Sequence, residues 1–454
     1  MDLGETTVST QDNHSLVPLA SIFGKRLDLA FDGGILTSDS GVLLLREVAA
    51  KTGILSGIIE AITDRRHKSY VAHRVAELVH QRVFQIACGY EDANDCDALK
   101  SDPGFKAACG RLPLSGADLA SQPTMSRFEN QITRSDLYRI ARAFVDAFIA
   151  SYHKPPRAII LDIDDTQDRV YGAQQLSLFN GYVGGYAYQP LHIYEGQSGK
   201  LITTILRPGV RPTGQEIVTI LKRLVALLRA AWPDVAIFLR GDAHFSSPQV
   251  QDFCAANDLY FILGQTSNTR LIALAKPVME KAKSLYEQTG KPVQLFTSFD
   301  YQAKTWDCAR RIICKAQINE KGQNTRFVVT NLESSRASFI YQNIYCARGQ
   351  MENFIKNHKT FLHSDRTSCH TFSANQFRLF LHSAAYVLIQ ALAQIGLQGT
   401  TWSNAQVNTL QNRFLKVAGR VCELKTKITF HLPASFPLQH LFDKMMCNLA
   451  KAVP

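Results

Sequence analysis

The part of the chain that most restricts its fold lies between residues 157 and 263, where strand-like and helix-like segments follow one another. Three β-rich runs come first, at Arg157–Asp164, Tyr188–Tyr194 and Leu201–Leu206. A helix is expected at Thr213–Ala231, because Thr213 and Glu216 have the spacing of a capping box. A strand, a helix and a strand follow, at Val235–Leu239, Pro248–Ala256 and Leu259–Leu263. The order β-β-β-α-β-α-β predicts an α/β fold with one mixed sheet.

Three regions are expected along the chain. The linker Lys154-Pro155-Pro156 ends a mainly helical N-terminal region, 1–153. Residues 154–395 contain the α/β segment, with an irregular, β-leaning insertion at 265–340, and residues 396–454 form a small basic C-terminal region. Helical periodicity is clearest at 42–52, 71–87, 137–150, 346–359 and 374–394.

The composition is that of a folded globular chain, with 46% hydrophobic and 20% charged residues among 454. It excludes wholesale disorder, collagen and a simple coiled coil. The formal net charge of +11 is unevenly distributed: residues 1–150 have 16 basic and 19 acidic side chains, and residues 301–454 have 19 and 7. A basic block indicates a polyanionic partner or, alternatively, only a basic surface.

The ten cysteines include no Cys-x-x-Cys pair, and the N-terminus MDLGETTVST has neither a basic start nor an apolar core. We therefore expect reduced thiols, no structural zinc, no signal peptide and a cytoplasmic protein. The longest apolar stretch, around Leu381–Leu397, is interrupted by His382, Gln390 and Gln394. It predicts a buried helix and no membrane span.

Carboxylates follow two of the expected strands at the point where each strand ends. Leu161-Asp162-Ile163-Asp164-Asp165-Thr166 closes the first, and Leu239-Arg240-Gly241-Asp242 closes the fourth. Strand alternation places Asp162 and Asp164 on one face, and buried charges need a partner or a metal. Because sites in open α/β sheets form at the C-terminal ends of strands, Asp164 and Asp242 are candidate ligands. An Asx-rich turn and a helix N-cap are the alternative, structural roles.

One expected helix in the last third has a face on which a single acid lies among cations. At 100° per residue, the side chains within an arc of about 80° are Tyr345, Arg348, Glu352, Lys356 and Lys359. Ordinary i,i+4 ion pairs are one interpretation of this pattern. Three cations exceed the need of one carboxylate, which suits a face that meets phosphates.

Together these features predict that Asp164, Asp242 and Glu352 converge at one sheet edge. Neighbouring carboxylates repel one another, and Mg²⁺ or Mn²⁺ relieves the repulsion by taking oxygen ligands from carboxylates and a substrate phosphate. Two such ions, about 3.5–4 Å apart, support in-line phosphoryl displacement by water or a DNA 3′-OH. Arg348 and Lys359 are then expected to hold neighbouring phosphates. Glycosidases also use paired carboxylates, but the cation-rich face disfavours that reaction.

The spacing Tyr345-x2-Arg348-x3-Glu352-x6-Lys359 resembles the Tyr-Arg-Glu-Lys signature of DDE-type bacterial insertion-sequence transposases. In that family the first Asp lies in an Asp-x-Thr context, as in Asp164-Asp165-Thr166, and the second ends a later strand, as Asp242 does. The resemblance extends along nearly the whole chain. Further similar segments are Phe31-Asp32-Gly33-Gly34, 119–124 and 375–379.

This resemblance implies a ribonuclease-H-like mixed sheet with a β-rich insertion, preceded by a helical domain that binds DNA ends. The C-terminal region is expected to contact DNA or to dimerise. The implied activity is cleavage and strand transfer of double-stranded DNA at terminal inverted repeats, into target DNA. The enzyme would act as a homodimer with two Mg²⁺ or Mn²⁺ ions, near the bacterial nucleoid and without a membrane.

The resemblance also assigns roles to single residues. Catalysis and metal binding fall to Asp164, Asp242 and Glu352, with Asp162 as a second ligand or a buried supporter. The DNA contacts it implies are at Tyr345, Arg348, Lys356, Lys359 and Trp306. In related transposases a Trp of the insertion stacks on a flipped base, and packing within the insertion is the alternative role for Trp306.

Two other functions stay open from the sequence. A nuclease of the same fold would cut DNA without joining it, and a transposase-derived DNA-binding protein would do neither. Retention of all three acids argues against the latter. In the acidic N-terminal region, a basic cluster at 65–68, with Arg74 and Arg82 after it, is either DNA-facing or a solvated loop.

Overall fold

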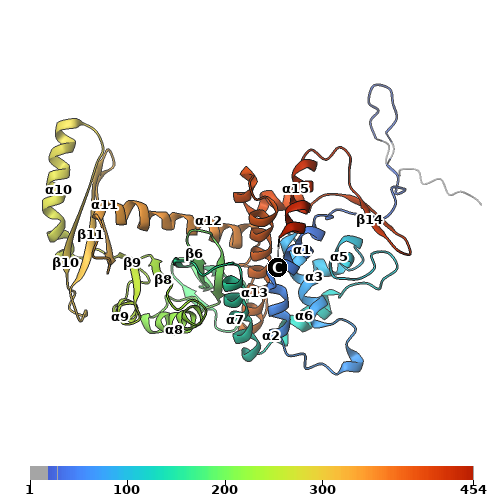
Figure 1. Ribbon diagram of the computed structural model, residues 1–454, viewed down its shortest axis with the longest axis horizontal. Coiled ribbons are helices and arrows are strands. Elements are labelled where there is room, and N and C mark those ends of the chain that lie inside the picture. The colour runs from blue at the N-terminus through green and yellow to red at the C-terminus, as the bar shows by residue number, and fades with distance from the viewer. Residues whose placement is uncertain (1–18, 28, 453–454) are drawn as a thin grey trace, which may run out of the picture.

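The computed structural model describes residues 19–27 and 29–452 of the chain. The molecule is elongated, with a helical body at one end and a smaller lobe of helix and strands at the other (Figure 1). A long helical segment runs between the two ends. The lobe is the expected insertion, and the helical body contains both the N-terminal and the C-terminal regions.

One eight-stranded mixed sheet forms the middle of the molecule, which confirms the predicted α/β fold with a large mixed sheet. Its strand order is β10-β11-β12-β9-β8-β2-β6-β7. The five strands that come before the insertion in the chain are β2 (Ala158–Asp165), β6 (Leu191–Glu195), β7 (Leu201–Ile205), β8 (Ala236–Gly241) and β9 (Leu259–Gln265). β2 pairs antiparallel with β6 and parallel with β8, and β9 is parallel to β8. The apolar runs of the sequence are therefore the central, fully covered strands.

Helices cover both faces of this sheet. On one side, α7 (Arg134–Ala150), α8 (Gly214–Ala231) and α9 (Pro248–Ala256) share an apolar core with the central strands. The predicted capping box at Thr213 and Glu216 is present and begins α8. On the other side lies α13 (Phe372–Ala391), continued by the π-helical turn η5 (Leu392–Gly396). That segment is long and apolar enough to cross a membrane, but 72% of its most apolar window is buried inside the protein, as expected for a core helix.

The insertion is more regular than the sequence indicated. It begins with the 21-residue helix α10 (Thr269–Thr289), where an irregular segment was expected. Three antiparallel strands follow, which are β10 (Val293–Tyr301), β11 (Arg310–Asn319) and β12 (Gly322–Thr330). β12 pairs antiparallel with β9, so the insertion extends the central sheet instead of forming a separate one.

The N-terminal region contributes several short elements to the helical body. Its elements are β1 (Leu36–Thr37), α1 (Val42–Thr52), α2 (Ile54–Ala61), η1 (Lys68–Tyr70), α3 (Val75–Ala87), α4 (Asp95–Leu99), α5 (Pro103–Ala108) and α6 (Gln122–Asn130). The basic cluster in this region is mostly engaged within the protein: Arg65 and Arg66 pair with Asp136 and Asp64, and the Arg82 side chain is fully buried against Glu129. Arg82 is therefore not on a DNA-facing surface.

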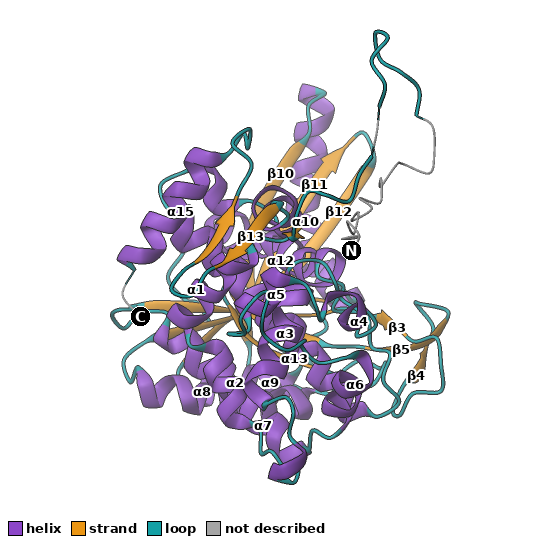
Figure 2. Cartoon of the chain, turned by 90° about the vertical axis from the view of Figure 1, so that its right-hand side faces the viewer, coloured by secondary structure: helices purple, strands orange, loops and turns teal. Residues whose placement is uncertain are grey.

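The C-terminal region joins the same body. Its elements are η6 (Thr401–Asn404), α14 (Val407–Leu410), η7 (Gln411–Leu415), β13 (Gly419–Glu423), β14 (Ile428–His431) and α15 (Gln439–Lys451). β1 pairs with β13, and helices from both ends of the sequence share one apolar core with α13. The two ends of the described chain are thus parts of one unit (Figure 2).

Two further features position the candidate site. The long helical segment between insertion and body consists of α11 (Ala337–Phe339), η2 (Ile340–Tyr345), η3 (Cys346–Gly349), α12 (Gln350–Lys356) and η4 (Asn357–Phe361). η2 and η4 are π-helical and η3 is a 3₁₀ turn. A small sheet of order β3-β5-β4 projects at one edge of the molecule (Figure 2), formed by β3 (Asp168–Arg169), β4 (Leu178–Asn180) and β5 (Gly185–Tyr188).

Candidate active site

Two of the predicted acids lie at the C-terminal ends of neighbouring parallel strands. Asp164 belongs to the end of β2, and Asp242 directly follows β8. Ile163 and Gly241 are paired across the two strands, so the following carboxylates are next to each other. Besides burial, the negative charges of Asp242 and Asp165 raise the pKa of Asp164. The three carboxylates are therefore close enough to repel one another. The sheet therefore brings together the first two acids at one edge, where sites in such sheets form.

Asp162 is part of a buried ion pair. Arg240, on β8, donates from Nε to Asp162 Oδ1 and from Nη2 to Oδ2, each at 2.5 Å. Its third nitrogen donates to the Ile344 carbonyl at 2.6 Å, which ties the long helical segment to the sheet. Gly196 leaves room for the pair, because an added Cβ would lie 2.6 Å from both Arg240 and Asp162. Of the two roles expected for Asp162, these contacts support that of a buried supporter.

Arg348 contacts the Asp164 carboxylate directly. Its Nη2 atom lies 2.8 Å from Asp164 Oδ2, and both side chains are mostly covered. Burial raises the pKa of Asp164 to about 7, the Arg348 charge opposes that rise, and Asp242 and Asp165 add to it. Several carboxylates thus lie near a single guanidinium, and their mutual repulsion raises the pKa of Asp164.

Tyr345 lies beside the turn after β8. An added Cβ at Gly264, on β9, would be 2.8 Å from the Tyr345 hydroxyl oxygen and 3.1 Å from the Asp242 carbonyl carbon. The glycine is required here by close approach. Because η3 is a 3₁₀ turn, Tyr345 and Arg348 are in line on one side of the segment. Both lie near the strand ends.

Asp165 is a further acid at this edge. Its Oδ2 atom is buried and has no hydrogen-bond partner within the described residues. Burial raises the pKa of Asp165, and a hydrogen bond from Gln189 opposes the rise. Asp242 is held by its own turn, because the His244 backbone N–H donates to Asp242 Oδ1 at 2.8 Å. Arg211 fixes the same turn by donating to the Ala243 and His244 carbonyls.

Glu352 is not gathered with the two Asp residues. It is exposed on α12, one turn after Arg348. Across residues 19–27 and 29–452, no three His, Cys, Asp or Glu side chains are close enough to form a metal site. Glu352 nevertheless lies on the same stripe of the helical segment as Arg348, which contacts the end of β2, and Lys359, which contacts the turn after it.

Lys359 anchors the other end of this stripe. Its ammonium donates to Thr166 Oγ1 at 3.0 Å and to the Gln167 carbonyl, and it lies 3.4 Å from Asp168 Oδ1. Burial raises the pKa of Asp168 to about 7, and Lys359 opposes that rise. Lys356 is exposed, with its ammonium 5.4 Å from the centroid of the Phe361 ring. The two lysines therefore differ: one is engaged by protein groups, and the other faces solvent.

Trp306 lies inside the insertion. It is 7% exposed, packs edge-on against Tyr301 at a centroid distance of 5.5 Å, and is covered by the Arg310 guanidinium. This is the packing role that was the alternative for Trp306, and the ring is not accessible for stacking on a base in this conformation.

Sequence reasoning missed four residues that shape the site: Arg240, Asp168, Arg211 and Gln189. Only Arg240 carried a detectable signal, because a charged residue in an otherwise apolar strand requires a counter-charge. The carboxylate oxygens of Asp164 and Asp242 are of the kind that a hard divalent cation takes, but the described residues bring no third such side chain close enough to complete a metal site.

Comparisons with known proteins add two findings. A model of the family described as transposase DDE domain group 1 matches residues 19–454. Among solved structures, the chain is similar to the piggyBac transposase in a synaptic complex with hairpin DNA, at 11% sequence identity and a TM-score of 0.42. That match covers 92% of this chain and 86% of the other. A comparison with curated proteins gave no significant match.

Proposed function

Because this chain belongs to the transposase DDE domain group 1 family, we propose that it is an insertion-sequence transposase of the Tyr-Arg-Glu-Lys type. It binds the terminal inverted repeats of its element, cuts the DNA and transfers the cut strand to a target. The observation that carries this proposal is the pair of carboxylates, Asp164 and Asp242, at two adjacent strand ends, with Arg348 of the signature bonded to the first.

The strand arrangement supports a ribonuclease-H-like catalytic domain. The order β7-β6-β2-β8-β9, antiparallel on one side of β2 and parallel on the other, is what that fold requires. We assign the catalytic domain to residues 154–395, with 265–340 as its insertion. Residues 1–153 and 396–454 then form the DNA-end-binding and C-terminal regions, and two copies assemble on the paired ends.

DDE transposases act with divalent metal ions, and we assign Asp164, Asp242 and Glu352 as the residues that hold Mg²⁺ or Mn²⁺ here. When bound, two such ions stabilise the attacking and leaving oxygens of an in-line displacement. Glu352 is exposed on α12 in this structure and would have to approach the strand ends to complete the set.

The cations of the signature are assigned to the DNA backbone. When DNA enters, Arg348 leaves Asp164 and pairs with a phosphate of the DNA backbone. Tyr345 hydrogen-bonds to the DNA next to it. Lys356 is already free to meet a phosphate, because it faces solvent. Lys359 keeps its bonds to the turn after β2 and contributes its charge at a short distance from the same strand ends.

The test uses a labelled duplex that carries the inverted repeats flanking the coding region, with Mg²⁺ and a target plasmid. Wild-type protein is expected to cut the end and to join it. Glu352→Gln should abolish cutting and leave end binding nearly intact, whereas Glu280→Gln, an exposed acid on α10, should retain both. Equal loss of binding and cutting would contradict the role of Glu352 as a metal ligand.

Two other outcomes separate the alternatives. Products that are cut and never joined to the target identify a nuclease of the same fold. Tight end binding by wild-type protein without any cutting, at several Mg²⁺ and Mn²⁺ concentrations, identifies a catalytically silent DNA-binding protein.

A further inference from the structure

A second lobe, separate from the insertion and rich in exposed aromatic side chains, follows the proposed catalytic strand β2. It is formed by β3, β4 and β5 and begins three residues after Asp165. Tyr171 and Tyr182 are 88% and 90% exposed, and Phe179 and Tyr186 are also exposed. Residues 169–188 contain one Arg and no Asp, Glu or Lys. So many uncovered rings in a short acid-free segment suit a partner with flat, stackable groups and negative charge outside them.

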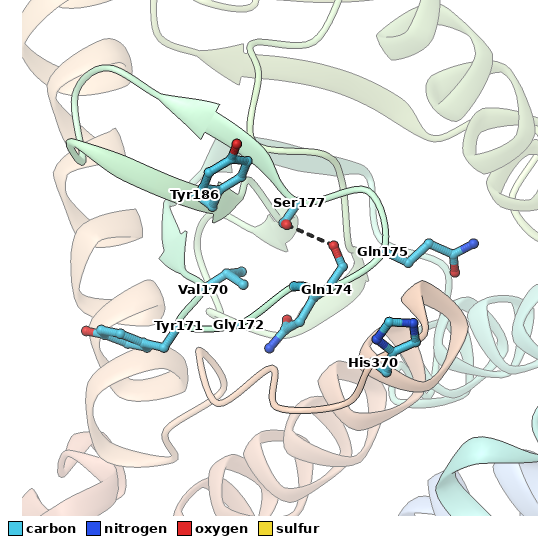
Figure 3. A pocket seen from close by; sticks show the side chains of 9 residues that line it. Val170, Tyr171, Gly172, Gln174, Gln175, Ser177, Tyr186 and His370 are labelled. Atoms are coloured by element: carbon cyan, nitrogen blue, oxygen red, sulfur yellow. Dashed lines mark hydrogen bonds between the residues drawn. The ribbon is translucent and has the colours of Figure 1, made fainter.

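The lobe and the loop before α13 together line an open cavity of about 770 Å³. Its walls include Val170, Tyr171, Gln174, Ser177, Tyr186 and His370. Figure 3 shows Tyr186 on one side and His370 on the other, with Val170 and Gln174 between them. The lining has aromatic and amide groups and no carboxylate or ammonium, so it suits a neutral, flat, polar ligand of moderate size.

The cavity is held in shape by hydrogen bonds to the loop before α13. The Gln175 N–H donates to the His370 carbonyl at 2.9 Å, and the Phe372 N–H donates to Gln175 Oε1 at 3.1 Å. Asn375 donates to the Cys369 carbonyl at 2.7 Å, which fixes the same loop. The walls therefore come from two chain segments that are joined before any ligand enters, which lowers the entropic cost of binding.

Polar groups in the walls are available to a ligand. Within the described chain, the Gln174 side-chain nitrogen has no hydrogen-bond partner, and the two ring nitrogens of His370 have none either. Ser177 Oγ donates to the Gln174 carbonyl. Arg169 is exposed at the start of the lobe, with its guanidinium 5.5 Å from the Tyr171 ring centroid. These groups match the parts of a nucleotide. An aromatic ring can stack on the base, the amide and the imidazole can hydrogen-bond to its edge, and the external cation can contact its phosphate.

The base of the lobe is tied to the proposed active site. Lys359 bonds to Thr166 and Asp168, the residues that lead from the Asp164–Asp165 carboxylates into β3. On this evidence, and on the premise of the proposed function, we propose that the cavity receives one unpaired nucleobase of the DNA strand that lies at the active site. Tyr186 stacks on the base, and Gln174 and His370 hydrogen-bond to its edge.

The test compares two fluorescent inverted-repeat duplexes that differ at one position near the cut, where 2-aminopurine is either paired with thymine or opposite an abasic site. Tyr186→Ala should weaken binding of the unpaired duplex by about 5- to 150-fold, the range for one base–aromatic stack. Binding of the paired duplex should change far less. Tyr186→Phe, which keeps the ring, should restore wild-type affinity and the quenching of 2-aminopurine.

Two matched controls accompany the comparison. Tyr138→Ala removes a tyrosine of nearly equal exposure, 59% against 57%, from α7, and it should change neither affinity. Gln174→Leu keeps the size of the side chain and removes its amide, and it should weaken the unpaired duplex alone. Thermal unfolding of every variant shows whether the fold is kept.

The outcomes separate this inference from the proposed function. Wild-type protein that neither binds nor cuts inverted-repeat DNA overturns both. Wild-type protein that binds and cuts, with Tyr186→Ala retaining its preference for the unpaired duplex, overturns the inference alone. A shift of oligomeric state in Tyr186→Ala, with unchanged DNA affinities, also overturns it, because the lobe is then a contact between copies of the chain.

Discussion

Replacing Asp162 by Asn separates its two expected roles, buried supporter and metal ligand. The substitution keeps the shape of the side chain and removes its charge, which leaves Arg240 without a counter-charge. Both side chains are at most 2% exposed, so water cannot compensate for the loss. Arg240 also donates to the Ile344 carbonyl, and its displacement would loosen the start of the signature helix.

The expected loss of stability follows from these contacts. Breaking a buried ion pair by removing one partner costs about 3–5 kcal/mol, because the other charge stays buried. At about 2–4 °C per kcal/mol for a domain of this size, the Tm should fall by about 6–20 °C. Removing both partners, as in Asp162→Leu with Arg240→Met, should cost clearly less than the sum of the single changes.

Asp164→Asn is the matched comparison, measured by thermal unfolding at pH 8 without metal. Burial raises the pKa of Asp164 from 3.8 to about 7 in the folded protein. The free energy of unfolding of the protein therefore falls as the pH rises through that value, because ionised Asp164 is less stable in the folded state than in the unfolded one. Neutralising it at pH 8 should therefore leave the Tm unchanged or higher. An unchanged Tm in Asp162→Asn, together with loss of metal-dependent cutting, would refute the supporter role and make Asp162 a ligand.

Three further predictions concern DNA, metal and pH. Arg348→Ala should weaken DNA binding and make the slope of log K against log salt shallower by about one, and an unchanged slope would count against a phosphate contact. Mg²⁺ at tenfold above its Kd should stabilise wild-type protein by about 1.4 kcal/mol in thermal unfolding, and Glu352→Gln should lose most of that gain. Hydrogen bonds from Arg65 and Thr133 hold the pKa of Asp136 below its usual value. Asp136→Asn should therefore lower the Tm at pH 7, and the difference should shrink as the pH falls below about 4, since stability from a depressed pKa is lost on acidification; a difference as large at pH 2 as at pH 7 would rule this out.

Local patterns were sufficient for much of the fold. The bounds expected for the helices at 42–52 and 248–256 match α1 and α9, because the first has clear periodicity and the second has Pro248 at its first turn after Ser247. β2 and β8 were visible as apolar runs. Elements whose stability depends on local sequence, or on burial from both sides, leave a signal in the chain itself.

The helix α10 left no such signal. Only Leu271, Ala275 and Ala282 are buried on it, and Pro277 lies in its interior. Alanines give little hydrophobic periodicity, and the proline is normally a helix breaker. The apolar partner of this helix is the sheet of β10 and β11, which follows it in the chain, so only the tertiary structure accounts for its formation.

The candidate site divides in the same way. The strand-end acids and the helix face each followed from local periodicity, and both ended near the same edge. The position of Glu352 did not follow, because a helix face fixes direction around the axis and says nothing about the distance from another element. That distance depends on the Arg348–Asp164 and Lys359–Asp168 contacts, which join residues far apart in sequence.

The uneven charge of the sequence also has a structural cause. Cations of the basic last third pair with acids from earlier in the chain, as in Lys416–Asp39, Arg366–Glu91, Arg378–Glu129, Arg348–Asp164 and Lys359–Asp168. Because the two ends of the chain fold into one body, a net charge counted along the sequence does not describe a surface. The excess of 19 basic over 7 acidic side chains at 301–454 therefore overstates the positive charge on the surface of that region, and the acidic excess at 1–150 understates it for the N-terminal region. Side chains that face solvent, such as Lys356, and pairs that DNA can open, such as Arg348–Asp164, are the ones that determine the salt dependence of binding.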